Sequence, residues 1–489
     1  MFNRVTTLKS TSAVVSLLVL CILLIVAAKG YFRFDDFAQL WENQFKVIGN
    51  PSKIITEQGW NGHYRPLEKL FFRVNHLLFG LKPLGYFIVL IAVFLLTQYM
   101  FFLLVRSLSG NVLAAYSSVF FFLLQGNLYL YTVGWISAAS TLLSGLFGLM
   151  SFMFYIKSTV GVQRVRLYYF FSLISFCLGL LSKESIIVFL ALFIAYDFLF
   201  LWLEAPSRKQ LIWRRLAYHV PFWILVVVYV FVRGSVAGAR ALTGGDHYTF
   251  TLGSNVLDNI IFYGMQLGFL PIAMFLVSLP ALFFDGLQLE RRDFKLIALG
   301  IFLAISAILP LLFFSWHSPT WTYFSAFGTT LASAVLFQRV FLGSSRKNML
   351  LLYYGTLMCA LVGNVFLFSQ LNQARWWQWG TYSKNIIEQV QTHYPDLPSG
   401  ARLFFIDKNP QKPYGVKGLF RSPDRLECAF QVWYVDRSLH AYIVDQTNPV
   451  ETILEAKRDA EDSLIFVFEY DQGTIIDKTI WLRERKLSN

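Results

Sequence analysis

Long apolar runs recur through the first 370 positions and constrain the fold more than any other feature. Each run is about 20 residues long, enough for a helix to cross a hydrocarbon core of roughly 30 Å. Hydrophobic residues make up 56% of the chain, a content that argues against an ordinary water-soluble fold. We therefore predict a polytopic α-helical membrane protein with about eleven spans, near residues 11–29, 84–105, 112–130, 135–156, 167–182, 185–203, 218–237, 264–284, 296–314, 321–341 and 349–369.

Basic residues are distributed unevenly between the two sides of this predicted topology. If the chain starts inside, sixteen of the 27 Lys and Arg before residue 371 fall on the inner side and eleven on the outer side. Eight of those eleven lie between Lys29 and Lys82. Elsewhere the bias follows the positive-inside rule, so the net charge of +13 does not call for a nucleic-acid partner. The first outer loop, residues 31–82, is the exception.

The composition changes at about residue 371. The last 119 residues hold 31 of the 71 charged residues, as expected for a segment in water. Ile386, Ile387 and Val390 indicate an amphipathic helix, and short β-branched and aromatic runs near residues 403–406, 442–444 and 464–468 indicate strands. Asp471-Gln472-Gly473 is typical of a hairpin turn. We predict a transmembrane domain at 1–370 and an outer, soluble α/β domain at 371–489.

Two adjacent carboxylates, Asp35 and Asp36, stand near the end of the first span. Ionisable groups close to a bilayer are costly to desolvate, so they mark a candidate functional site. Neighbouring residues seldom point the same way, and we expect only one of the two to face a site. A carboxylate held in this position is suited to act as a general base. The alternative is that the pair caps or solvates the start of a loop.

Residues 65–80 read as an amphipathic helix that begins with Pro66 and ends at Gly80. Arg65, Lys69 and Arg73 recur at i, i+4 and i+8 and form a positive stripe, opposite an apolar face suited to the membrane interface. The apolar face consists of Leu67, Leu70, Phe71, Val74, Leu77 and Leu78. Lys69 and Arg73 have an alternative role in attracting anionic headgroups. Arg65 is the better phosphate ligand, because a guanidinium binds phosphate oxygens in bidentate fashion.

A second polar intrusion, Ser182-Lys183-Glu184-Ser185, separates two apolar runs. A hairpin between spans needs only small polar residues, so the Lys183-Glu184 pair is more than the turn requires. We expect Lys183 to contact a lipid-linked phosphate and Glu184 to orient it, the alternative being a local ion pair. Arg233 lies about one turn inside the seventh span and either snorkels to the interface or adds another cation to this site.

Several short motifs occur in the order seen in one superfamily. They are Phe34-Asp35-Asp36, His63-Tyr64-Arg65-Pro66-Leu67, Leu78-Phe79-Gly80 with Pro83 and Gly85-Tyr86, and Leu180-Leu181-Ser182-Lys183-Glu184-Ser185. Over roughly residues 1–370 the chain resembles GT-C glycosyltransferases, in particular protein O-mannosyltransferases of the transmembrane-and-tetratricopeptide type and their bacterial relatives. Such enzymes take a sugar from a polyprenyl phosphate and pass it to an acceptor outside the cytoplasm.

The resemblance implies roles for particular residues. Asp35, with Asp36 beside it, is expected to be the base, and Arg65 and Lys183 to contact donor phosphate. We expect Lys69, Glu184 and Arg233 to support the phosphate site, and His63 and Tyr64 to contact substrate. Where relatives carry His-Asn and Arg-Tyr motifs, this chain has Phe87, Leu90 and Phe94, and Thr320-Trp321-Thr322-Tyr323. The resemblance therefore does not specify the donor sugar.

We expect no metal cofactor, because the second outer loop, Gln125 to Gly134, has no carboxylate and the donor already carries an activated leaving group. The expected partners are the bilayer, a polyprenyl-phosphate sugar, and a glycan, lipid or protein acceptor. Two alternatives remain: an oligosaccharide ligase or polymerase, and a transporter or flippase of lipid-linked sugars. A bacterial inner membrane, with the active site on the periplasmic side, is the predicted location.

Overall fold

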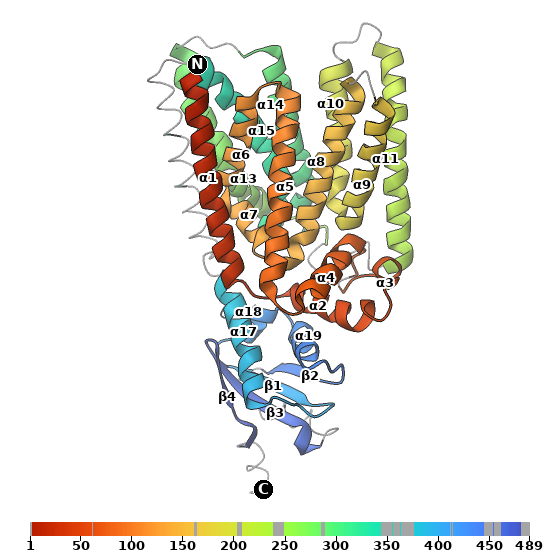
Figure 1. The fold of residues 1–489 in the computed structure, drawn as a ribbon, viewed down its shortest axis with the longest axis vertical. Coiled ribbons are helices and arrows are strands. Elements are labelled where there is room, and N and C mark those ends of the chain that lie inside the picture. The colour runs from red at the N-terminus through yellow and green to blue at the C-terminus, as the bar shows by residue number, and fades with distance from the viewer. Residues whose placement is uncertain are drawn as a thin grey trace.

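The computed structural model describes residues 2–60, 62–160, 164–202, 208–237, 249–284, 289–343, 376–410, 414–444 and 461–480, and single positions 355, 362, 412 and 453. It has two parts (Figure 1). A bundle of long helices forms the larger part. The first loop segment and a small sheet-containing domain both lie at the same end of that bundle.

Eleven helices, most of them long, form the bundle in the described residues. Their bounds are α1 (Phe2–Lys29), α5 (Pro83–Ser109), α6 (Val112–Leu124), α7 (Gly126–Val133), α8 (Ala139–Val160), α9 (Val165–Ser182), α10 (Val188–Tyr196), α11 (Arg208–Ala237), α13 (Ser254–Phe284), α14 (Arg291–Ile308) and α15 (Tyr323–Gly343). Within the described residues, eight helical segments are long and apolar enough to cross a membrane. These eight correspond to eight of the predicted spans, and α1 contains the predicted first span.

The predicted span 112–130 is wrong as a single helix. α6 ends at Leu124, and α7 begins again at Gly126 after Gln125. The side chain of Gln125 donates a hydrogen bond to Thr330 Oγ1 at 2.9 Å, so the break is held by a polar contact inside the bundle. The predicted span 349–369 lies almost entirely outside the described residues, and the predicted boundary at 370/371 lies entirely outside them.

The first loop folds into short helices at the end of the bundle: α2 (Asp35–Glu42), a π-helical turn (Asn43–Val47), α3 (Lys53–Thr56) and α4 (Pro66–Phe79). α4 matches the predicted interfacial helix, with Pro66 in its first turn and Gly80 after its end. Its apolar face is divided: Phe71 is buried, whereas Leu70, Val74, Leu77 and Leu78 are exposed. An exposed apolar stripe next to the membrane spans is the arrangement of a helix that lies in the interface.

The C-terminal domain confirms the predicted mixture of helices and strands. It contains α17 (Trp376–His393), β1 (Arg402–Asp407), α18 (Val416–Phe420), α19 (Pro423–Tyr434), β2 (His440–Val444), β3 (Ile465–Asp471) and β4 (Thr474–Asp477). The strand order is β2-β1-β3-β4, with β1 parallel to both neighbours and β3 antiparallel to β4. Gln472 and Gly473 make the predicted hairpin turn with positive φ angles, and Ile386, Ile387 and Val390 of α17 are buried.

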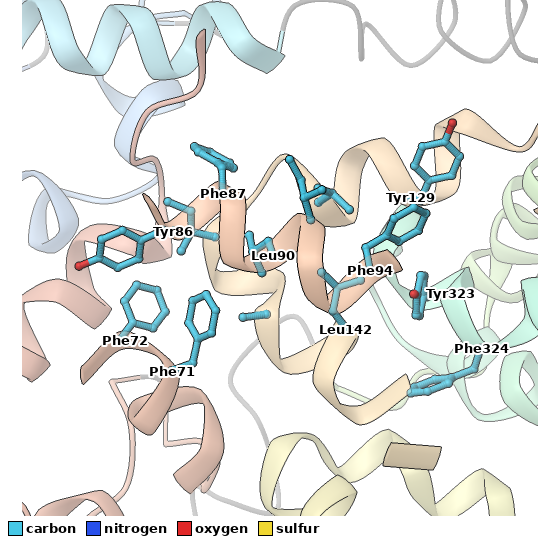
Figure 2. Packing of buried hydrophobic residues seen from close by; sticks show 14 of the residues in the cluster. Phe71, Phe72, Tyr86, Phe87, Leu90, Phe94, Tyr129, Leu142, Tyr323 and Phe324 are labelled. Carbon is cyan, nitrogen blue, oxygen red and sulfur yellow. The ribbon is translucent and has the colours of Figure 1, made fainter. Parts of the chain in front are cut away.

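Aromatic side chains join the loop helices to the bundle. Figure 2 shows Phe71 and Phe72 of α4 beside Tyr86, and a continuous row of buried side chains leading to Tyr323. The ring centroids of Phe72 and Tyr86 are 6.1 Å apart, within the range of favourable aromatic contacts. This packing places α4 and the loops that precede it at a defined position on the bundle.

Small residues bring two spans of the bundle close together. A Cβ atom built on Gly300 of α14 would lie 2.6 Å from the backbone oxygen of Gly328 in α15. Only glycine permits so close a backbone approach, which is the usual way for membrane helices to pack without a hydrophobic driving force. The two helices are therefore fixed against each other beside the loop that carries His317.

Candidate functional site

A cavity of about 540 Å³ lies between the loop helices, the bundle and the C-terminal domain. Five of the predicted site residues line it: Asp35, His63, Arg65, Lys69 and Lys183. Glu68, which was not predicted, also lines it beside Arg65. Four other predicted residues, Asp36, Tyr64, Glu184 and Arg233, stand behind this surface. Segments 119 residues apart in sequence thus meet at one cavity, as Arg65 and Glu184 show.

Asp35 faces the cavity at the start of α2. Its Oδ1 atom accepts a hydrogen bond from Arg425 Nε at 2.6 Å and forms an ion pair with Arg425 Nη2 at 2.5 Å. Arg425 belongs to α19, so a residue of the C-terminal domain orients this carboxylate. The side chain of Asp35 keeps 20% of its surface exposed, which leaves it accessible from the cavity.

Asp36 points away from the cavity and is fully buried. Its Oδ1 accepts hydrogen bonds from the backbone N–H and the hydroxyl of Ser137 at 2.7 and 2.6 Å, and its Oδ2 accepts from the backbone N–H of Arg33 at 3.0 Å. Burial raises the pKa of Asp36 to about 7, against the opposing effect of these hydrogen bonds. Asp36 therefore ties the first loop to the turn that precedes α8, and Asp35 is the member of the pair that faces the cavity.

Arg65 is held by a carboxylate on the neighbouring hairpin. Its Nη2 and Nε donate to Glu184 Oε1 and Oε2 at 2.8 and 3.3 Å, and Arg233 Nη1 lies 3.4 Å from the same Oε2. The carboxylate of Glu184, which we expected to act beside Lys183, thus pairs directly with the two arginines. Arg233 lies behind Arg65 and supports it through this shared carboxylate.

Lys183 reaches the cavity from the turn between α9 and α10. Its ammonium donates to Thr141 Oγ1 at 2.8 Å, and its backbone oxygen accepts from the hydroxyl of Ser144. Thr141 is a neutral partner, and the two carboxylates that act on this ammonium, Glu68 and Glu184, are themselves paired with Arg65. Lys183 is thus placed to attract an anion in the cavity.

Lys69 has a different surrounding from the one expected. Its ammonium forms an ion pair with Glu42 Oε1 at 2.6 Å and donates to the backbone oxygens of Glu57 and Gln58 at 2.9 and 3.0 Å. Only 5% of the residue is exposed. These contacts use the ammonium to hold the first loop against α4, so its geometry does not support the predicted contact with donor phosphate.

His63 and Tyr64 lie at different positions relative to the cavity. His63 lines the cavity, and burial together with nearby Arg65 lowers its pKa to about 3, so its ring is neutral at physiological pH. Tyr64 is buried behind the cavity, and its backbone oxygen accepts a hydrogen bond from Tyr229 at 3.1 Å. Of the two predicted substrate contacts, only His63 is in a position to make one.

We expect buried Glu68 to make the stability of the protein depend on pH. Burial raises its pKa from 4.5 to about 7, although nearby Arg65 acts in the opposite direction. The folded protein then binds this proton more tightly than the unfolded chain, so the Glu68 contribution to stability is greatest at low pH and falls as pH rises from about 4.5 to about 7. The side chain in Glu68→Gln is neutral at every pH. We therefore expect this variant to lack a decrease in the free energy of unfolding, on the order of 3 kcal/mol, over this pH range.

The thermal unfolding midpoint measured between pH 4.5 and 8 in detergent, for wild type and Glu68→Gln, tests this expectation. Glu57→Gln serves as the control, since Glu57 is a partly exposed loop carboxylate paired with Lys53. Parallel profiles for wild type and Glu68→Gln would contradict it.

Several residues of the cavity were not predicted from the sequence. Arg421 and Arg425 come from the C-terminal domain, and His317 comes from the segment between α14 and α15. The guanidinium of Arg421 lies 4.3 Å from the ring centroid of Phe34, a cation–π contact that fixes it beside Asp35. The spacing of four residues between Arg421 and Arg425 was a visible signal, but nothing in the sequence placed it opposite the first loop.

No group of three or more His, Cys, Asp and Glu side chains in the described residues is arranged to hold a metal ion. The cavity lining carries five cationic side chains, Arg65, Lys69, Lys183, Arg421 and Arg425, and two carboxylates, Asp35 and Glu68. This excess of positive charge suits an anionic ligand.

Comparison with known proteins identifies the fold. No protein-family model matches the chain, and no curated protein matches it. The crystal structure of apo ArnT from Cupriavidus metallidurans is similar, with a TM-score of 0.55 and 12% identity over 94% of this chain and 93% of that one. The structure of the same protein bound to undecaprenyl phosphate has a TM-score of 0.58, with the same identity and coverage. The chain therefore has a GT-C fold, which confirms the fold implied by the sequence motifs.

A more distant match is the apo oligosaccharyltransferase of Archaeoglobus fulgidus, with a TM-score of 0.40 and 13% identity over 71% of this chain and 56% of that one. The likeness is too weak to support a conclusion.

Proposed function

We propose that this protein is a membrane glycosyltransferase that moves a sugar from a polyprenyl-phosphate donor to an acceptor hydroxyl. One observation carries the proposal: a single cavity is lined by the carboxylate of Asp35 and by the cations Arg65 and Lys183. A base and a phosphate site within one cavity are what such a transfer requires.

In the proposed reaction Asp35 takes the proton from the acceptor hydroxyl, and the oxygen of that hydroxyl attacks the anomeric carbon of the donor. The bond between that carbon and the phosphate oxygen breaks, and its electron pair leaves with the polyprenyl phosphate. The result is a single displacement with inversion. Arg65 and Lys183 stabilise the negative charge of the leaving phosphate, and Glu184 fixes Arg65 for this purpose. Because the donor brings its own leaving group, the step needs no metal.

The donor lipid fits the position of the cavity. Asp35 and Arg65 belong to the segment at the end of the bundle, and α4 there exposes Leu70, Val74, Leu77 and Leu78. A polyprenyl chain would lie along the spans with its phosphate at this level. The ArnT structure with bound undecaprenyl phosphate supports the choice of lipid. By the positive-inside rule this end of the bundle faces outward, toward the periplasm if the membrane is a bacterial inner membrane.

Incubation of the purified protein with an undecaprenyl-phosphate-linked sugar and candidate acceptors tests the proposal. Mass spectrometry is expected to detect free undecaprenyl phosphate together with an acceptor that has gained the sugar. A glycan product would identify an oligosaccharide ligase or polymerase. Movement of intact donor across reconstituted vesicles, with no undecaprenyl phosphate released, would instead indicate a transporter and contradict the proposal.

Arg425 is expected to act as a positioning residue for Asp35. Arg425→Gln removes the ion pair to Asp35, and we expect transfer to fall by roughly 10- to 100-fold, since a hydrogen bond to a charged group is worth about 1.5–3 kcal/mol. The effect should appear in kcat, with little change in the affinity for undecaprenyl phosphate, because Arg65 and Lys183 remain.

The matched control is Lys417→Gln, which removes an exposed cation from α18 in the same domain. It should transfer sugar at the wild-type rate. If both variants lose activity equally, or if Arg425→Gln lowers only donor affinity, Arg425 does not position the base.

A further inference from the structure

One wall of the candidate active site has no part in the proposed reaction. It consists of residues 316–321, between α14 and α15, and Phe262 of α13, all of which line the cavity. None of these seven residues is Asp, Glu, Lys or Arg, and three of them are Phe or Trp. We call this surface the aromatic wall. It differs in chemistry from the charged walls that carry Asp35, Arg65 and Lys183.

Two asparagines of α13 hold the aromatic wall in place. Asn255 and Asn259 are four residues apart, so they lie on the same face of the helix. Their side-chain Nδ2 atoms donate to the backbone oxygen of Phe314 at 3.2 and 2.9 Å, respectively. Asn259 also donates to the backbone oxygen of Leu312 at 3.0 Å. The loop that carries His317 is therefore attached to α13 through its backbone.

These contacts also determine which nitrogen of His317 carries a proton. A backbone oxygen can only accept, so the amide nitrogen of Asn259 faces the two carbonyls and its Oδ1 faces His317. Nδ1 of His317 lies 3.2 Å from this Oδ1 and can bond to it only as a donor. In a neutral imidazole the other nitrogen, Nε2, is then an acceptor. Nε2 has no hydrogen-bond partner among the described residues.

The imidazole of His317 is neutral and is held in one orientation. Its ring centroid lies 4.1 Å from that of Phe262, with 31° between the ring planes. Partial burial lowers the pKa of His317, against the opposing effect of Asp258, so Nε2 carries no proton at physiological pH. The aromatic wall therefore offers one fixed hydrogen-bond acceptor beside apolar rings.

A displacement with inversion needs a separate surface for the sugar ring. The acceptor oxygen and the leaving phosphate lie on opposite sides of the anomeric carbon. Asp35 serves the first of these directions, and Arg65 and Lys183 serve the second. The ring that contains this carbon must rest on another wall. Ligand sites commonly combine apolar rings with a few placed polar groups, and a sugar presents both C–H faces that pack on aromatic rings and hydroxyl groups that need acceptors.

We propose that the aromatic wall binds the donor sugar and that Nε2 of His317 accepts a hydrogen bond from one of its hydroxyl groups. This inference rests on the proposed function and adds the class of sugar. Five cationic side chains line the cavity and the aromatic wall has no carboxylate, so the cavity disfavours a sugar with a cationic amine. A sugar carboxylate would meet the lone pair of Nε2. The sugar that fits is an uncharged hexose or pentose.

Binding to the purified full-length protein, measured by microscale thermophoresis, tests the inference separately from turnover. The probes are undecaprenyl phosphate and its glucose, mannose, galactose, arabinose and glucosamine conjugates. Wild type is expected to bind at least one uncharged conjugate about three- to tenfold more tightly than undecaprenyl phosphate, the usual contribution of a neutral hydrogen bond. His317→Phe should lose this preference and keep its affinity for undecaprenyl phosphate. His317→Gln, which retains an acceptor, should keep part of the preference.

His393→Phe is the control, because His393 is an exposed histidine of α17 that does not line the cavity. It should bind every probe like wild type. Equal affinities of wild type and His317→Phe for every conjugate would overturn the inference and leave the transfer reaction standing. Tightest binding of the glucosamine conjugate would overturn the assignment of an uncharged sugar. Failure of wild type to bind undecaprenyl phosphate would contradict the proposed function itself. Should His317→Phe fail to fold, His317→Ala also removes the acceptor and decides the outcome.

Discussion

Replacing Asp35 by Asn is expected to lower the rate of sugar transfer by about 10²–10⁴-fold, the usual contribution of a general base. Asparagine has the same shape as aspartate and can still accept a hydrogen bond from Arg425, so the junction between α2 and α19 should persist. The amide cannot take the acceptor proton, however. Affinity for undecaprenyl phosphate should change little, because Arg65 and Lys183 are untouched.

Single-turnover release of undecaprenyl phosphate measures the chemical step, and the thermal unfolding midpoint reports on the fold. Asp424→Asn is the matched control, since it makes the same change at an exposed carboxylate beside Arg425. Near-normal turnover by Asp35→Asn would show that the base lies elsewhere. Loss of donor binding in that variant would show that Asp35 contacts the donor instead.

Lys183→Gln is expected to reduce transfer by about 10²–10³-fold, comparable with the removal of one charge-stabilising donor from an active site. The physical reason is that the ammonium of Lys183 has the hydroxyl of Thr141 as its hydrogen-bond partner at 2.8 Å. Its charge is thus available to the leaving phosphate. Most of the loss should appear in kcat, because negative charge on the bridging oxygen develops as the bond to the sugar breaks.

Thr141→Val separates the charge of Lys183 from its placement. The valine variant keeps the ammonium but removes its hydroxyl partner, so we expect a loss of tenfold or less. Rates for the two variants, measured with saturating donor, give the comparison. A larger loss in Thr141→Val than in Lys183→Gln would contradict a direct role for Lys183.

Local patterns were sufficient to predict much of the fold. The length of the apolar runs located the eight long spans, Pro66 and Gly80 located the ends of α4, and short β-branched and aromatic runs located β1, β2 and β3. The break at Gln125 was missed because its stabilising partner, Thr330, lies 205 residues away. The apolar sequence around Gln125 does not show a contact with a residue so far along the chain.

The position of a site residue could be predicted only where its neighbours in the sequence determine where its side chain lies. Asp35 follows the first span closely, and Lys183 stands in a tight hairpin, so both were located near the cavity. The partners of Lys69 and Glu184 depend on tertiary packing: Lys69 pairs with Glu42, and Glu184 pairs with Arg65 and Arg233, contacts that the sequence did not predict. The pairing of Asp35 with Arg425 joins residues 390 positions apart, a separation at which periodicity and spacing carry no information.

The docking of α18 and α19 on α2 and the π-helical turn after it limits how this protein can be divided. Besides the Asp35–Arg425 pair, Gln44 Nε2 donates to the backbone oxygen of Val432 at 3.3 Å, and the ring of Phe37 packs 5.1 Å from that of Phe420. A truncation that ends before the C-terminal domain would strip these partners from the membrane part and expose its apolar surface to water. An inactive truncated protein would therefore say nothing about acceptor choice, and chimaeras between relatives would need to exchange α2 and α19 together.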